Sequence, residues 1–222
     1  MQIDETERCI MEQSMVLKFF GGVSQDASSL AVDFEKVLRE LAAWLLPIGV
    51  CLLAEGLRLE KWRKIETLAS YRYVTVKKWW RRKFAGIMRN GVLTAAVMFI
   101  MAMAADIVND GKLSDKSLNV FFLWLVHMIL TMTFFLMLDL TGVRKLAPAI
   151  LLLSEGGTFL VGFSNTRIAR FMYGMWGMYF QSKWYFEETG VSVLSSILFE
   201  MALIALIYLA GGIFLERKGV FV

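Results

Sequence analysis

The stretch from Leu118 to Leu138 contains no Asp, Glu, Lys or Arg, and it restricts the fold more than any other feature. About 20 apolar residues in a helix cross the hydrocarbon core of a bilayer. No water reaches backbone groups there, so a spanning segment must close its own hydrogen bonds as a helix. The composition agrees, because 57% of the residues are hydrophobic and the mean hydropathy is +0.56. The sequence therefore predicts an all-α integral membrane protein.

Four further apolar stretches approach spanning length. They are Leu41–Ala54, Gly91–Val108, Leu146–Phe163 and Val191–Leu215. Together with Leu118–Leu138 they predict five transmembrane helices. The stretch Met15–Val23 is too short to span and is expected on the membrane surface. We divide the chain into an acidic, amphipathic N-terminal segment, residues 1–40, and a single transmembrane domain, residues 41–222.

The basic residues are distributed unevenly between the two sides that five spans define. Fifteen of the 24 Lys and Arg residues lie on the side of the first inter-span connection, most of them within residues 58–89. The positive-inside rule predicts that this side, and with it the C-terminus, faces the cytoplasm. The first 27 residues lack a basic start followed by an apolar run, so we expect no cleavable signal peptide.

The basic connection between the first two spans has an apolar face. Leu59, Trp62 and Ile65 recur at helical spacing and predict an amphipathic helix at the cytoplasmic surface. A second helix is expected to begin at Val76, capped by Thr75. Two roles stay open for this connection. It contacts anionic lipid headgroups, at about 1 kcal/mol per basic residue near the surface, or it docks on a cytoplasmic partner.

Aromatic residues gather at both expected membrane surfaces. On the cytoplasmic side, the sequence predicts a membrane anchor formed by Trp79, Trp80, Arg81 and Arg82. On the other side, residues 164–190 are rich in aromatic and Met side chains, including Trp176, Met178, Tyr179 and Trp184. This outer segment predicts a re-entrant or interfacial helix. It is either an ordinary aromatic belt or an adaptable surface for an amphipathic peptide or lipid.

Three ionisable residues, His127, Glu155 and Glu200, lie inside the predicted spans. Such residues usually face protein or water, so they predict either a substrate path or polar contacts between helices. One His and two Cys cannot form a multi-histidine or zinc site, and we expect no bound metal. No cluster of catalytic residues is evident, and no phosphate-binding loop is present. We therefore expect no enzymatic activity from this chain alone.

Two sets of residues resemble known motifs. The first set lies in and around the basic connection and consists of Glu55, Glu66, Leu68, Thr75, Lys77 or Lys78, and Lys83. The second set lies near the C-terminus and consists of Gly211, Gly212, Phe214, Arg217 and Lys218. From Glu55 to Val222 the chain resembles ABC-2-type exporter permeases, most closely the small subunits associated with bacteriocin or lantibiotic export and immunity. That family usually has six spans and a proline after the coupling helix. This chain has five predicted spans and lacks the proline. The stretch Met11–Val23 is then either a remnant of the first helix of that family or an unrelated surface segment.

The resemblance implies a permease subunit of an ABC exporter in the bacterial cytoplasmic membrane, moving a peptide, lipid or other amphipathic substrate. Its coupling helix would dock on a partner through Glu55, Leu59, Trp62, Ile65, Glu66 and Leu68. The partners implied are an ATP-binding cassette subunit, a second permease copy or paralogue, and membrane lipids, but no nucleic acid. ATP and Mg²⁺ would bind the cassette subunit, and this chain would hold no cofactor. The alternative is a non-transport membrane protein: an assembly, immunity or sensor subunit.

Overall fold

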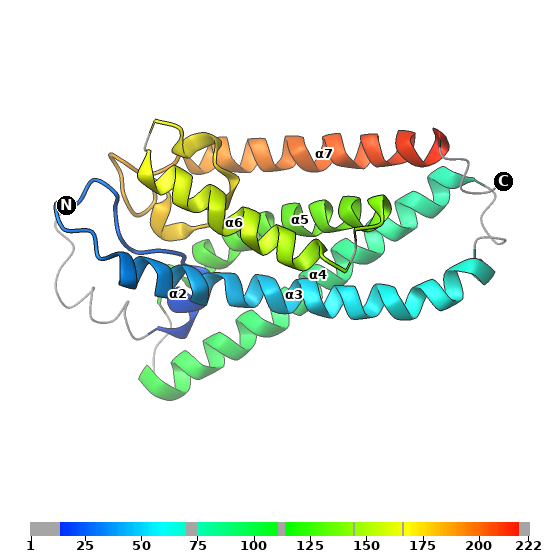
Figure 1. The fold of residues 1–222 in the computed structure, drawn as a ribbon. Coiled ribbons are helices and arrows are strands. Elements are labelled where there is room, and N and C mark those ends of the chain that lie inside the picture. Colours follow the sequence, from blue (N-terminus) through cyan, green and yellow to red (C-terminus); the bar gives the residue numbers. More distant parts are fainter. Residues whose placement is uncertain (1–13, 70–74, 111–113, 144, 166, 218–222) are drawn as a thin grey trace.

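A computed structural model describes residues 14–69, 75–110, 114–143, 145–165 and 167–217, without the side chains of 62–69, 110 and 217 (Figure 1). Five long helices form the bundle: α3 (Phe34–Ala69), α4 (Val76–Asp110), α5 (Ser117–Thr141), α6 (Ala147–Ser164) and α7 (Val193–Arg217). A short helix, α2 (Met15–Phe20), precedes them. All five are long and apolar enough to cross a membrane. The predicted all-α fold with five spans is confirmed.

Helix α5 forms the centre of the bundle. It packs against α4, α6 and α7, and also against α2. In its most apolar stretch 61% of the residues are buried, against 17% in the corresponding stretch of α7. A helix that is hydrophobic on all sides favours such a central position, whereas the exposed apolar faces of α7 are suited to lipid.

The two ends of the bundle are built from different elements (Figure 1). At the lid end, on the left of the view, α2 lies beside residues 167–191, which we call the lid. At the basic end, on the right, α3 ends, α4 begins and α7 ends. There Lys83 donates from Nζ to Asp139 Oδ2 at 3.0 Å and links α4 to α5.

Helix α3 differs from the predicted arrangement of a span followed by a separate coupling helix. It continues without a break from Phe34 to Ala69, through Glu55 and Gly56. Charged residues make a helix favour water over lipid, but neither they nor a single glycine end the helix. The amphipathic region is therefore a continuation of the same helix beyond the span. The predicted start of the next helix is confirmed, because α4 begins at Val76 and the Lys78 amide donates to Thr75 Oγ1.

Helix α2 lies inside the bundle, which corrects the expectation that this stretch sits on the membrane surface. Val16, Leu17 and Phe20 are buried. The Phe20 ring meets the Trp124 ring edge-on, with 4.7 Å between centroids. Six residues in a helix span only about 9 Å, so α2 fills the lid end of the core and is not a sixth span.

The lid contains three short 3₁₀ turns in place of the single outer helix that the sequence predicts: η2 (Ala169–Phe171), η3 (Tyr173–Met175) and η4 (Tyr179–Gln181). Gln181 Nε2 donates to the carbonyls of Val23 and Gln25, so the lid is tied to the segment after α2. Asp26 adds a second tie by accepting from Thr189. Partial burial alone would raise the pKa of Asp26, but its hydrogen bonds from Thr189 and Ser28 lower it below the usual value.

We predict that Gly211→Ala destabilises the bundle, because a methyl group there overlaps the Trp80 ring packed on α7. Overpacking of this kind costs about 1–3 kcal/mol. The neighbouring change Gly212→Ala is the matched control, since its added methyl would lie 3.6 Å from Trp80 Cδ1, an ordinary contact. Thermal unfolding in detergent measures both. Equal melting temperatures for the two variants would contradict close packing of α4 on α7.

Candidate functional site

Three ionisable side chains meet in the core of the bundle. His127 on α5 lies between Glu155 on α6 and Glu200 on α7. Its Nδ1 is 2.7 Å from Glu200 Oε1, and its Nε2 is 3.1 Å from both oxygens of Glu155. All three residues are fully buried. We call these residues the His–Glu–Glu cluster.

The cluster lies near the middle of the candidate membrane spans α5, α6 and α7. His127 follows the first residue of α5, Ser117, by nearly three turns, or about 15 Å, which is half the thickness of a hydrocarbon core. Thr131, one turn further along the same face, donates from Oγ1 to Glu155 Oε1 at 2.9 Å. The cluster therefore ties together α5, α6 and α7, the three spans that follow α4.

Aromatic rings and the lid enclose the cluster. The Trp44 ring of α3 lies 5.5 Å from the imidazole, centroid to centroid, and the Tyr173 ring of η3 lies 6.2 Å from it. The lid approaches so closely at Gly177 that an added methyl group would overlap the His127 side chain. At Gly174 an added methyl would overlap the Glu155 carbonyl. Glycine at both positions lets the lid backbone lie directly on the cluster.

The cluster is suited to holding protons. An imidazole between two carboxylates places a proton donor or acceptor on each side of the ring. Within the described part of the chain, no group of three His, Cys, Asp or Glu side chains is arranged to hold a metal ion. Glu200 Oε2 is buried and has no hydrogen-bond partner among the described residues, although Oε1 of the same carboxyl contacts the ring. The arrangement is thus an enclosed acid–base cluster with one unpaired oxygen.

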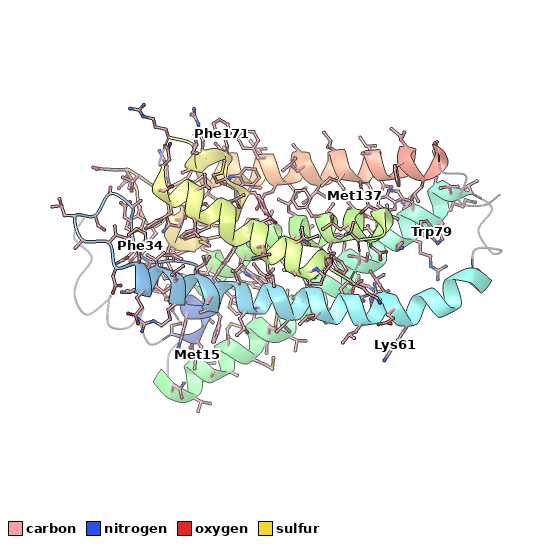
Figure 2. All side chains as sticks on the ribbon, viewed as in Figure 1. Met15, Phe34, Lys61, Trp79, Met137 and Phe171 are labelled. Atoms are coloured by element: carbon pink, nitrogen blue, oxygen red, sulfur yellow. The ribbon has the colours of Figure 1, made fainter. Side chains whose placement is uncertain are left out.

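The predicted docking residues divide into two groups. Glu55 is buried and accepts from the Arg58 guanidinium on its own helix, and Leu59 is buried as well. The other four, Trp62, Ile65, Glu66 and Leu68, lie on the part of α3 whose side chains are outside the described residues. Lys61, just before them, lies toward the basic end (Figure 2). The docking role of this helix stays a prediction.

The four residues of the predicted membrane anchor lie at the start of α4. Figure 2 shows one of them, Trp79, toward the basic end. Arg81 and Arg82 are exposed, whereas Trp79 and Trp80 are buried against protein. Trp80 Nε1 donates to the Tyr208 carbonyl on α7 at 2.8 Å. The structure therefore gives Trp80 a packing role between helices, and the anchoring role stays a prediction.

The outer aromatic and Met residues are mostly buried. Trp176 stacks on Phe199 of α7, and Met178 and Tyr179 are enclosed, while Trp184 is half-exposed. These residues pack the lid onto the bundle. Only Trp184 among the four presents a large surface for a lipid or peptide.

Sequence reasoning missed the role of Asp106. Its carboxylate accepts from the Ser14 hydroxyl at 2.8 Å and from the amides of Met15 and Val16, so it holds the N-terminus of α2. Ser before an apolar run is a recognised helix-start signal, and Asp106 stands out as an acid near a span end. No sequence signal pairs the two. Nor does any signal place Trp44 or Tyr173 beside His127.

Neither a scan of protein-family models nor searches of curated proteins and solved structures found a match to the chain. Helix length and hydropathy identify the chain as a multi-pass helical membrane protein. Beneath the lid, the fully buried His–Glu–Glu cluster is its candidate functional site.

Proposed function

We propose that the chain is the membrane subunit of a bacterial ABC-type exporter, coupled to a separate ATPase subunit. The observation that carries the proposal is the length of α3 and α4, which have 36 and 35 residues. Such helices measure about 54 Å, against about 30 Å for the hydrocarbon core. Both extend beyond α5 and α6 at the basic end (Figure 1).

The ends of α3 and α4 that extend beyond α5 and α6 form a projection, and the surface of this projection favours a protein partner. Lys61, Arg81 and Arg82 are exposed there, and so is Lys77, which pairs with Glu216 of α7 at 3.3 Å. The α3 helix continues past Lys61 to Ala69, through a stretch that includes the apolar residues Trp62 and Ile65. By the positive-inside rule this end faces the cytoplasm, where ATP-hydrolysing subunits work.

Two contacts provide a route for mechanical coupling from the projection to the core. Movement of α4 by an attached ATPase would act on α5 through the Lys83–Asp139 ion pair and on α7 through Trp80. Both helices carry a member of the His–Glu–Glu cluster. Alternating access would follow from these shifts, with a second permease copy or paralogue forming the other wall of a path for a peptide, lipid or other amphipathic substrate.

We predict that the double change Trp62→Ala and Ile65→Ala abolishes co-purification of the ATPase subunit while the protein still inserts and folds. Tryptophan often dominates interface energies, and losing two apolar anchors should weaken binding at least about 100-fold, or roughly 3 kcal/mol. Leu53→Ala with Leu57→Ala is the matched control, because both side chains are exposed on the same helix within the span.

Affinity purification from mild detergent, with the candidate ATPase co-expressed, measures the outcome. Loss of the ATPase only in the Trp62/Ile65 variant supports docking on the projection. An ATPase retained equally by both variants, or no ATPase partner at all, would favour an assembly, immunity or sensor subunit instead.

A further inference from the structure

The geometry of the His–Glu–Glu cluster sets a minimum for the number of protons it holds. Each ring nitrogen of His127 faces a carboxylate oxygen, at 2.7 Å on one side and 3.1 Å on the other. An unprotonated nitrogen and an ionised carboxylate both only accept, so each contact requires a proton between its atoms. A neutral imidazole carries one N–H. The cluster must therefore hold at least one proton more than a neutral imidazole with two carboxylates.

The most natural place for this extra proton is the ring, as an imidazolium that donates to both carboxylates. The cluster then has a net charge of −1 with no exposed surface. Buried, uncompensated charge is strongly unfavourable in a low-dielectric interior. A second extra proton would make the cluster neutral.

Glu200 is the site at which this second proton fits. Both oxygens of Glu155 accept from the ring, and one of them also accepts from Thr131. Glu200 Oε2, by contrast, has no hydrogen-bond partner in the part of the chain that the structure describes. A proton there displaces no existing hydrogen bond, whereas a proton on Glu155 would displace a donor.

We propose that the His–Glu–Glu cluster is a proton-binding site, in which Glu200 takes up and releases a proton while the lid controls access of water. The step is Glu–COO⁻ plus hydronium giving Glu–COOH plus water. This inference does not rest on the exporter assignment, because it concerns the isolated chain. Among the described groups that face the cluster, the remaining titratable one is Tyr173, whose hydroxyl is hydrogen-bonded to Ser154; α3 contributes the non-titratable Trp44.

The lid is the barrier between the cluster and the solvent at the lid end. Its backbone lies on the His127 side chain at Gly177 and on α6 at Gly174. Met178, the residue after Gly177, is fully buried. Proton exchange from this end therefore requires the lid to lift.

One histidine in the whole chain makes the first test unusually specific. Protein grown with ¹⁵N-histidine, purified through a tag without histidine and placed in lipid nanodiscs, reports on His127 alone by NMR. We expect both ring nitrogens to carry protons throughout about pH 5 to pH 8, the range in which an ordinary histidine titrates. A neutral ring at pH 7 would overturn the proposal.

Infrared difference spectroscopy locates the second proton. We expect a C=O stretch from a protonated carboxyl in the wild type, which disappears in Glu200→Gln and persists in the matched variant Glu155→Gln. A spectrum unchanged by Glu200→Gln, or a band lost only in Glu155→Gln, would overturn the assignment to Glu200.

Gly177→Ala tests the lid, with Gly157→Ala as the matched control, because an added methyl at Gly157 meets no atom within 4 Å. After transfer to D₂O, the carboxyl band should shift about tenfold faster in Gly177→Ala, since a strained lid opens more often. Met178→Ala, which loosens the lid without touching either carboxylate, should act in the same direction and serves if Gly177→Ala does not fold. Wild-type exchange rates in a folded lid variant would overturn the gating role.

Discussion

Replacing His127 with leucine is expected to destabilise the folded protein by about 3–5 kcal/mol, the typical cost of removing one partner from a buried ion pair. Without the imidazole, the carboxyl groups of Glu155 and Glu200 would lie in the core with no cation between them. Unfolding by a denaturing detergent in mixed micelles gives the free energy of unfolding.

The triple variant His127→Leu, Glu155→Leu and Glu200→Leu is the informative comparison. Replacing an entire buried charged triad with apolar residues is often neutral or stabilising, so most of the lost stability should return. If the triple variant is as unstable as His127→Leu, the cluster contributes through packing rather than charge. If His127→Leu costs less than about 1 kcal/mol, the hydrogen bonds of the cluster are not those described.

Replacing Asp106 with alanine is the second change with a large expected effect. It leaves three donors at the start of α2 without an acceptor: the Ser14 hydroxyl and the amides of Met15 and Val16. A buried donor left unsatisfied costs about 1–3 kcal/mol. We expect α2 to detach from the bundle while the five spans stay folded.

Hydrogen exchange followed by mass spectrometry measures this release as faster exchange over residues 15–20. Asp115→Ala is the matched control, because Asp115 is exposed and lies shortly after α4. Protection of α2 that is unchanged in Asp106→Ala would show that apolar burial of Phe20 and Leu17 suffices to hold the helix.

The sequence by itself determined the five spans and the start of α4. An uncharged stretch such as Leu118–Leu138 is stable in a bilayer only as a helix, because only a helix satisfies its backbone polar groups. Local chemistry also placed the boundary at Val76, where Thr75 caps the helix. The sequence defined the end of the first span less well. Glu55 marks the change from apolar to charged residues, but α3 continues through it as one helix.

Only the tertiary structure decided which buried groups meet. His127 and Glu200 are 73 positions apart, and Ser14 and Asp106 are 92 apart. Helical periodicity gives each span a face but not the neighbour toward which that face turns. Burial of α2 and the close seating of the lid at Gly177 depend on the shape of the space between packed helices. The His–Glu–Glu cluster exists because packing turns one face of each of α5, α6 and α7 toward the same point, which no single segment encodes.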